Sequence, residues 1–186
     1  QMVAINQPRL VEKLVLIMSS PNHQVFVDGF VGKDTSKHGL PASDPKIIEY
    51  YEHILGIEPS EQMYAQARYR ELQKKVIDAP VHLTEVRIFE GRILKRLKSK
   101  YHIHNHSFAI ANSKNLQSQL ATIRVTTLII HGKEDYILPV EHGRMLAKLM
   151  PHSQYLEYEG MGHCLTPAVS RRLLSDLHTF CAGEDI

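Results

Sequence analysis

The sequence predicts an α/β fold built on a parallel β-sheet, and two observations carry this prediction. Three short runs rich in apolar or β-branched residues have the length of strands, and each is followed by turn residues and a helical pattern. The repeating order of strand and helix is typical of parallel sheets with right-handed crossovers. The runs are 13–19 (KLVLIMS), 125–130 (VTTLII) and 154–159 (QYLEYE).

Two helices are predicted to follow the second and third strands. The first has Pro139 in its first turn and ends at Pro151. The second begins near Pro167. Each carries an apolar face at helical spacing, so each is expected to pack on the sheet. The faces comprise Val140, Gly143, Ala147 and Met150 in the first helix, and Val169, Leu173, Leu174, Leu177 and Phe180 in the second.

A helical insertion is predicted between the first and second strands. It begins as a loop, and Asp44-Pro45 then starts a helix that ends at Gly56. Ser60 and Thr84 are typical caps of further helices. The predicted organisation is therefore a core formed by 1–20 and 121–186, interrupted by an insertion at 21–120.

The composition indicates a globular chain with a core of its own. Of the 186 residues 43% are hydrophobic and 23% are charged, and the apolar run 14–18 is too short to cross a bilayer. The net charge of +2 does not by itself indicate a nucleic-acid or membrane partner. Cys164 and Cys181 lack metal-type spacing, which favours free thiols and a cytoplasmic location.

One segment, 92–100 (RILKRLKSK), concentrates five basic residues without an acid. The apolar residues around it recur at helical spacing, so it is expected to form a helix with a basic outer face. A solvated surface helix is the favoured interpretation, and contact with anionic lipid or nucleic acid is the alternative.

Two residues with catalytic chemistry follow the second and third predicted strands, which could lie side by side in the sheet. Asp135 comes three positions after Gly132, and His163 follows the turn Gly160-Met161-Gly162. Because adjacent strands lie about 4.8 Å apart, loops at their carboxyl ends can meet. We expect Asp135 to accept a hydrogen bond from Nδ1 of His163, leaving the other ring nitrogen free to act as a base.

The neighbours of Asp135 have simpler interpretations. His131 is expected to end the strand and pack. Glu134 is a rival acid, but it falls two residues past Gly132 and is expected to face solvent. Cys164 is adjacent to His163, and adjacent side chains rarely form a Cys–His catalytic pair.

These motifs resemble the α/β-hydrolase superfamily, with its esterases and lactonases. The late segment HGKEDYILP (131–139) is similar to that family's H/S-G-x-x-D-x-hydrophobic-hydrophobic-P pattern, and GMGH (160–163) to its G-x-G-H pattern. The start is similar to the family's A-x-x-x-P-x-x-V-x-x-L-V-L segment, through Ala4, Pro8, Val11 and 14–16. The resemblance implies the C-terminal part of an α/β-hydrolase sheet, with 21–120 as a helical lid.

The resemblance also implies a function: hydrolysis of a carboxylic ester or lactone by a Ser-Asp-His triad. Asp135 and His163 would be its catalytic acid and base, and Tyr136 and Ile137 would line the rim of an apolar substrate pocket. No metal or organic cofactor is implied. Because the reaction depends on the nucleophile, an aspartate-nucleophile dehalogenase or epoxide hydrolase and a non-catalytic binding protein are the alternatives.

The family's nucleophile belongs to a G-x-S-x-G turn that precedes the acid and the histidine. No two glycines of this chain are four positions apart. We therefore expect the chain to be a fragment whose serine and oxyanion-hole amides lie outside it. The edge left beside 13–19 would then be covered by the missing N-terminal half or by a second copy.

A run of histidines offers a different chemistry. His102, His104 and His106 occupy alternate positions, which would share one face of an extended chain and could then bind zinc. The favoured interpretation is a polar lid loop.

Overall fold

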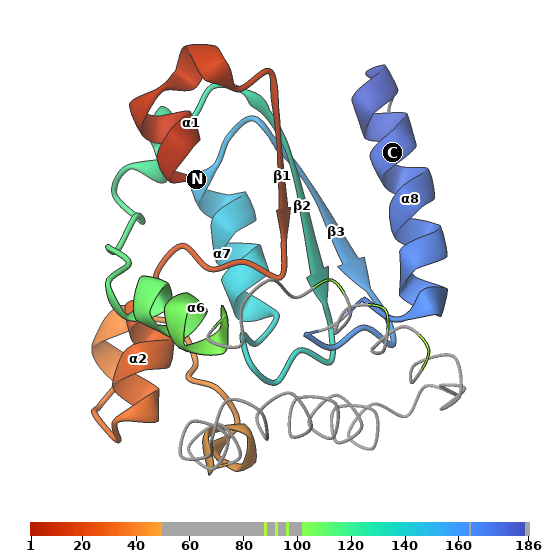
Figure 1. Cartoon of the computed structure of the whole chain (residues 1–186). Helices are drawn as coiled ribbons and strands as arrows, with labels where there is room; N and C mark the ends of the chain where they lie inside the picture. The colour runs from red at the N-terminus through yellow and green to blue at the C-terminus, as the bar shows by residue number, and fades with distance from the viewer. Residues whose placement is uncertain (50–87, 89–91, 93–95, 97–101, 164, 185–186) are drawn as a thin grey trace.

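The predicted α/β class is confirmed by the computed structural model, which describes residues 1–49, 88, 92, 96, 102–163 and 165–184. Within these residues one parallel sheet has the order β1-β2-β3 (Figure 1). Its strands are β1 (Lys13–Ile17), β2 (Thr126–Gly132) and β3 (Ser153–Tyr158). The sequence placed the end of the second strand at 130, but the pairing continues through His131 and Gly132.

The helices of the described residues cover both faces of this sheet. Figure 1 shows α7 and α8 on opposite sides of it, with α1 on the side of α7. The α-helices are α1 (Met2–Asn6), α2 (Gln24–Phe30), α6 (His102–Ala111), α7 (Glu141–Leu149) and α8 (Pro167–Ala182). Short 3-10 turns lie at Pro8–Leu10, Ser36–His38 and Leu120–Thr122.

The central strand β2 is buried on both faces, which explains its unbroken run of apolar and β-branched residues. Ile129 packs toward α7, in a cluster with Leu146 and Met150. Leu128 and Ile130 point the other way and pack with residues of α8. The alternation of side chains along a strand thus divides one apolar run between two cores.

Most of the apolar stripe predicted for the last helix, α8, is confirmed. Val169, Leu173 and Phe180 are buried against the sheet. Leu174 is 67% exposed, so its inclusion in the stripe was wrong. It follows Leu173 directly, and neighbouring helix positions differ by about 100° in direction, so only one of the two leucines can face the sheet.

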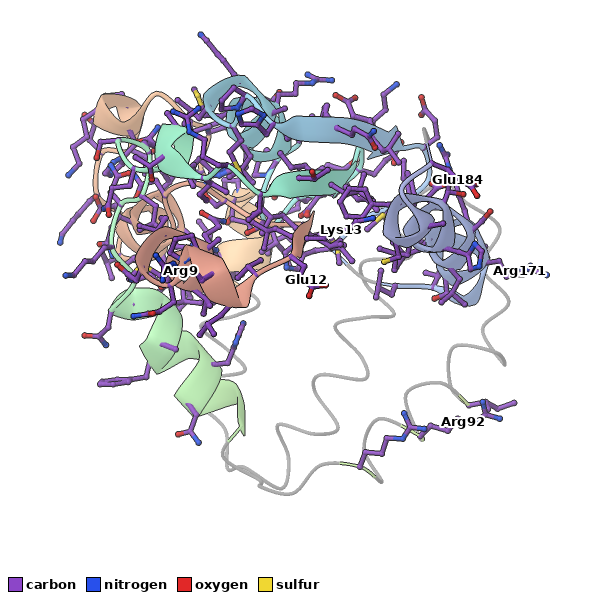
Figure 2. The ribbon with its side chains drawn as sticks, turned by 90° about the horizontal axis from the view of Figure 1, so that it is seen from above. Arg9, Glu12, Lys13, Arg92, Arg171 and Glu184 are labelled. Atoms are coloured by element: carbon purple, nitrogen blue, oxygen red, sulfur yellow. The ribbon has the colours of Figure 1, made fainter. Side chains whose placement is uncertain are left out.

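Both ends of α8 are fixed by polar contacts. The hydroxyl of Thr166 accepts a bond from the backbone N–H of Val169, and Gly183 ends the helix with a left-handed φ of 84°. Lys13 extends from β1 to this end, where its Nζ donates to the carbonyls of Phe180 and Cys181 (Figure 2). The lysine therefore joins the first strand to the last helix at the negative end of the helix dipole.

The insertion is described in part. Its first predicted helix begins at Pro45 and is helical up to Glu49, where the described range ends. The predicted caps at Ser60 and Thr84 and most of the basic segment 92–100 lie outside the described residues, although Arg92 and Arg96 are exposed. The boundaries 1–20, 21–120 and 121–186 stay a prediction. No described helix has the length and apolar character needed to span a membrane.

The histidine run is a helix, not the predicted loop. Residues 102–111 form α6, and His106 is exposed. In a helix, residues two apart point in different directions, so the alternate histidines do not share a face. Alternate polar residues do not by themselves decide between a helix and an extended chain, because contacts with neighbouring segments decide it. The sequence pattern therefore did not reveal this helix.

Gly132 ends β2 at a very close contact with the turn before His163. A Cβ atom at this position would lie 2.0 Å from the carbonyl oxygen of Met161. The backbone N–H of Glu134 donates to that same oxygen at 3.1 Å. A glycine is therefore required for the two loops to meet.

Replacement of Gly132 by alanine is expected to destabilise the protein by several kcal/mol, because either the carbonyl of Met161 or the strand end must move. The measurement is chemical denaturation of the chain. Gly39→Ala is the matched control: its φ of 65° is strained for alanine, but no atom lies within 4 Å of the added methyl group. It should cost only about 1–2 kcal/mol. Equal losses in both variants would contradict the proposed clash.

Candidate active site

Asp135 lies in the loop after β2 and is held by the backbone of its own loop. Its Oδ1 accepts hydrogen bonds from the N–H groups of Ile137 and Leu138, both at 2.9 Å. The side chain is buried, with the residue 3% exposed. This short-range cradle is a local turn motif of aspartate, and it leaves Oδ2 available for another partner.

That partner is His163. Its Nδ1 lies 2.7 Å from Oδ2 of Asp135, so the hydrogen bond expected from the sequence is present. Because a carboxylate can only accept, Nδ1 carries the proton. The other ring nitrogen, Nε2, has no hydrogen-bond partner among the described residues, and the side chain is 28% exposed. The ring is thus fixed at one nitrogen and free at the other.

The pKa of Asp135 is held well below its usual range. Burial by itself would raise it, but the interaction with His163 and hydrogen bonds from His131, His163 and the backbone of Leu138 outweigh this effect. The carboxylate is therefore ionised at neutral pH. An ionised carboxylate in contact with an imidazole ring can stabilise positive charge that develops there during a reaction.

His131 supports the loop rather than facing substrate. It is fully buried, and its Nε2 donates to the carbonyl of Leu138 at 2.8 Å while lying 3.5 Å from Oδ2 of Asp135. Gly143 of α7 packs against the ring, where a Cβ would lie 2.7 Å from Nδ1. The sequence predicted packing but not this contact with the acid loop.

Glu134 does not compete with Asp135 for His163. Its carboxyl atom Oε2 is buried and has no hydrogen-bond partner in the described structure. The prediction that it faces solvent was therefore wrong in part. Cys164 lies outside the described residues, and Cys181 is a free, exposed cysteine.

A cavity of about 490 Å³ opens beside His163. Its wall includes Ile137, one of the two predicted rim residues, whereas Tyr136 does not line it and is 36% exposed. Most of the other wall residues are apolar. They include Ile17, Met18, Phe26, Ala109, Ile110 and Leu138.

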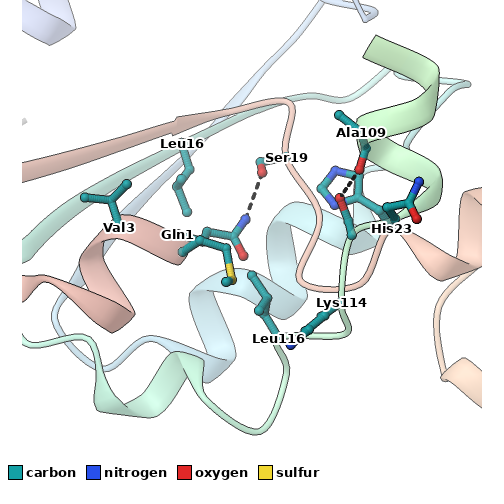
Figure 3. A pocket seen from close by; sticks show the side chains of 11 residues that line it. Gln1, Val3, Leu16, Ser19, His23, Ala109, Lys114 and Leu116 are labelled. Carbon is teal, nitrogen blue, oxygen red and sulfur yellow. Dashed lines mark hydrogen bonds between the residues drawn. The ribbon is translucent and has the colours of Figure 1, made fainter. Parts of the chain in front are cut away.

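A second cavity, of about 520 Å³, lies beside the first and shares His23, Ala109 and Ser113 with it. Figure 3 shows this cavity between α1 and the end of α6, where the side chain of Gln1 donates to the hydroxyl of Ser19 at 2.9 Å. His23 therefore stands in the wall between the two cavities. Sequence reasoning did not single it out, because a lone loop histidine carries no motif.

His23 is a neutral group at physiological pH. Burial is the main reason that its pKa is lowered to about 4, and the proximity of His142, His106 and His163 lowers it further. An uncharged imidazole in this wall can donate to or accept from a polar group in either cavity.

Among the described residues, no group of three or more His, Cys, Asp or Glu side chains is arranged to hold a metal ion. The side chains of His102 and His104 are not among those described.

Within the described residues, a three-stranded parallel sheet has helices on both faces and carries the loops of Asp135 and His163 at its carboxyl edge. This arrangement is that of the α/β-hydrolase fold. No family model matches this chain. A stretch of 58 residues is 33% identical to AB hydrolase superfamily protein YisY of Bacillus subtilis (strain 168), and it makes up 31% of this chain and 22% of the relative.

Solved structures extend the likeness over the whole chain. The structure of Rv0554 from Mycobacterium tuberculosis has a TM-score of 0.65 at 17% identity, covering 100% of this chain and 61% of its own. An esterase from Exiguobacterium antarcticum has a TM-score of 0.59 at 18% identity, covering 91% and 57%. An alpha/beta fold family hydrolase from Bacillus anthracis str. Sterne has a TM-score of 0.60 at 13% identity, covering 95% and 60%.

The relationship to α/β-hydrolases inferred from the motifs is therefore confirmed at the level of the fold. The chain spans less than two thirds of each of these structures. The catalytic roles of Asp135 and His163, and the substrate contacts of Tyr136 and Ile137, stay predictions.

The lowered pKa of His23 predicts a pH-dependent stability. As pH falls below about 6.5 the unfolded chain takes up a proton at His23 before the folded chain does, so folding stability falls until about pH 4. The loss from this group is at most about 3 kcal/mol. His23→Gln should flatten the curve of unfolding free energy against pH over this window.

His178→Gln is the matched control, because His178 is exposed on α8. Urea denaturation at intervals between pH 7 and pH 4 measures the effect. If His23→Gln and His178→Gln give the same pH dependence as the unaltered chain, His23 does not titrate as its burial requires.

Proposed function

We propose that the chain supplies the acid and the base of a Ser-Asp-His site that hydrolyses a carboxylic ester or lactone. The observation that carries the proposal is the 2.7 Å contact between His163 Nδ1 and the buried Asp135, with His163 also lining a cavity whose wall is mostly apolar. The esterase from Exiguobacterium antarcticum has the same fold and lends support to an ester substrate. The serine would belong to sequence outside these 186 residues.

In this mechanism Nε2 of His163 takes the proton of the serine hydroxyl as the oxygen attacks the ester carbonyl. The ring becomes an imidazolium, which the ionised Asp135 stabilises through the Nδ1–H bond. The same proton then passes to the leaving alcohol. Attack by water on the acyl-enzyme repeats the two proton transfers and releases the acid.

The apolar lining of the 490 Å³ cavity supports an apolar acyl group as the part of the substrate bound there. Ile137 would contact that group from the acid loop. The same arrangement serves a lactone, because a lactone is an ester whose leaving alcohol remains tethered to the acyl group. Tyr136, which is not part of the cavity wall, would contact the substrate at the rim.

The edge of β1 supports a proposal about partners. Within the described residues β1 pairs with β2 alone, so the backbone groups on its other edge have no strand beside them. Met2, Val3 and Leu10, which precede the strand, are exposed. We propose that this edge is covered by a second polypeptide, either the remaining part of the fold or another copy of the chain. Light scattering on the isolated chain should find more than one copy per particle, and a stable monomer would overturn self-association.

Replacement of His163 by alanine in a protein that also contains the nucleophile should lower kcat for a short aryl ester by on the order of 10³ or more, because the general base is lost. Asp135→Asn should also cost heavily, because an amide can favour the wrong ring tautomer. His178→Ala, at an exposed position, is the matched control and should retain full activity. Steady-state kinetics measure all three variants.

A fluorophosphonate probe separates the candidate reaction classes in the same protein. A serine nucleophile should be labelled, and the labelling should slow sharply in His163→Ala. Normal turnover in both His163→Ala and Asp135→Asn would refute the assignment of acid and base. Activity that depends on both residues without labelling of a serine would instead favour an aspartate nucleophile.

A further inference from the structure

Three hydrogen bonds tie the beginning of the predicted lid to the acid loop and to α7, two of them to the loop and one to the helix. The N–H of Asp44 donates to the carbonyl of Tyr136 at 2.9 Å. The hydroxyl of Ser43 donates to the carbonyl of Ile137. Nε2 of His142 donates to the carbonyl of Pro41, also at 2.9 Å. Residues 41–44 therefore run along the loop that carries Asp135, although they lie more than 90 positions away in the sequence.

The hydrogen bond from Ser43 reaches a residue that itself binds the carboxylate of Asp135. Ile137 donates its N–H to Oδ1 of Asp135, and the carbonyl of the same residue accepts from Ser43. Ser43 is 5% exposed, and its hydroxyl bonds to the acid loop rather than to its own segment. The carbonyl of Ile137 belongs to the peptide unit whose N–H is that of Leu138, the second donor to Oδ1.

The position of Ser43 is itself fixed by buried contacts. His142, which holds Pro41, has a pKa lowered chiefly by burial, so the ring is neutral at physiological pH. With its proton on Nε2, its Nδ1 accepts from the hydroxyl of Ser20, at 2.8 Å. Ser20 and His142 are both almost fully buried. Segment 41–44 is therefore anchored to the core on one side and to the acid loop on the other.

We propose that Ser43 is a positioning residue for Asp135. By fixing the peptide unit between Ile137 and Leu138, its hydroxyl keeps the N–H of Leu138 aimed at Oδ1 and so helps to direct Oδ2 toward His163. The catalytic consequence rests on the proposed function, whereas the effect on the carboxylate does not.

Loss of the hydroxyl affects a buried carbonyl. In Ser43→Ala the carbonyl of Ile137 loses its donor, and a buried acceptor without a partner is unfavourable. The peptide unit can recover a hydrogen bond only by turning toward water, which also turns the N–H of Leu138 away from Oδ1. The cradle of Asp135 then opens without any change in the aspartate itself.

Amide hydrogen exchange on the 186-residue chain tests this inference. Exchange at Leu138 should accelerate roughly 3- to 10-fold in Ser43→Ala, which corresponds to the loss of one hydrogen bond. Exchange at Ile137 should change less, because its N–H belongs to the preceding peptide unit, whose carbonyl accepts from Asp44. The amides of Ile129 and Ile130 in β2 should change less. Ser36→Ala is the matched control, because Ser36 is exposed and its hydroxyl donates to Asp34. It should leave all four amides unchanged.

Ser43→Thr keeps a hydroxyl and should restore slow exchange at Leu138. Unchanged exchange at this amide in Ser43→Ala would overturn the proposal. So would an equal acceleration in β2, because that result would indicate general destabilisation, and so would failure of threonine to restore the slow exchange.

The catalytic part is tested separately in the protein that contains the nucleophile. Ser43→Ala should lower kcat with little change in KM, and Ser43→Thr should recover the activity. If His163→Ala retains full turnover, the proposed function fails, but the exchange experiment still decides whether Ser43 positions Asp135. If His163→Ala is inactive and Ser43→Ala has normal kcat, the catalytic consequence assigned to Ser43 is wrong.

Discussion

The parallel pairing of β2 with β3 is the constraint on which the site depends. Because the two strands run in the same direction, their carboxyl ends reach the same edge of the sheet, and the loops that follow emerge side by side. The pairing continues to Gly132, which passes so close to Met161 that no side chain fits between them. This backbone contact brings Asp135 within hydrogen-bond distance of His163. The other features of the site depend on that approach.

Burying a carboxylate at this edge has a cost that the surrounding groups offset. Asp135 accepts bonds from two backbone N–H groups and from His163, with His131 close by. A buried charge with this many donors stays ionised, whereas the same group without them would hold its proton. The donors come from the acid loop, the end of β2 and the loop after β3. The ionised form of the carboxylate is therefore stabilised by contributions from all three segments.

The sequence predicted the strands and the Asp–His contact because both depend on short-range patterns. Apolar runs of strand length mark β1 and β2, and the separation of Asp135 from His163 fits one helix and one strand. The contact of Ser43 with Ile137 was not predictable in this way, because it joins residues 94 positions apart and serine has no motif there. The prediction of a loop at the histidine run was wrong, because residues 102–111 form a helix. Alternate polar residues are compatible with a helix that has an exposed outer side. Tyr136 and Ile137 were both predicted to line the rim because they follow Asp135 in the sequence. Of the two, only Ile137 lines the cavity.

Asp135 holds His163 with its proton on Nδ1 and leaves Nε2 free. Nitrogen-15 NMR of the histidine rings at alkaline pH measures this tautomer directly in the isolated chain. His163 is expected to be mainly the Nδ1–H form, with its Nδ1 proton shifted downfield by the carboxylate. In Asp135→Ala that proton signal should be lost, and the ring should favour Nε2–H, as free imidazole side chains do. A ring that is already mainly Nε2–H in the unaltered chain would show that Asp135 does not hold His163 through Nδ1.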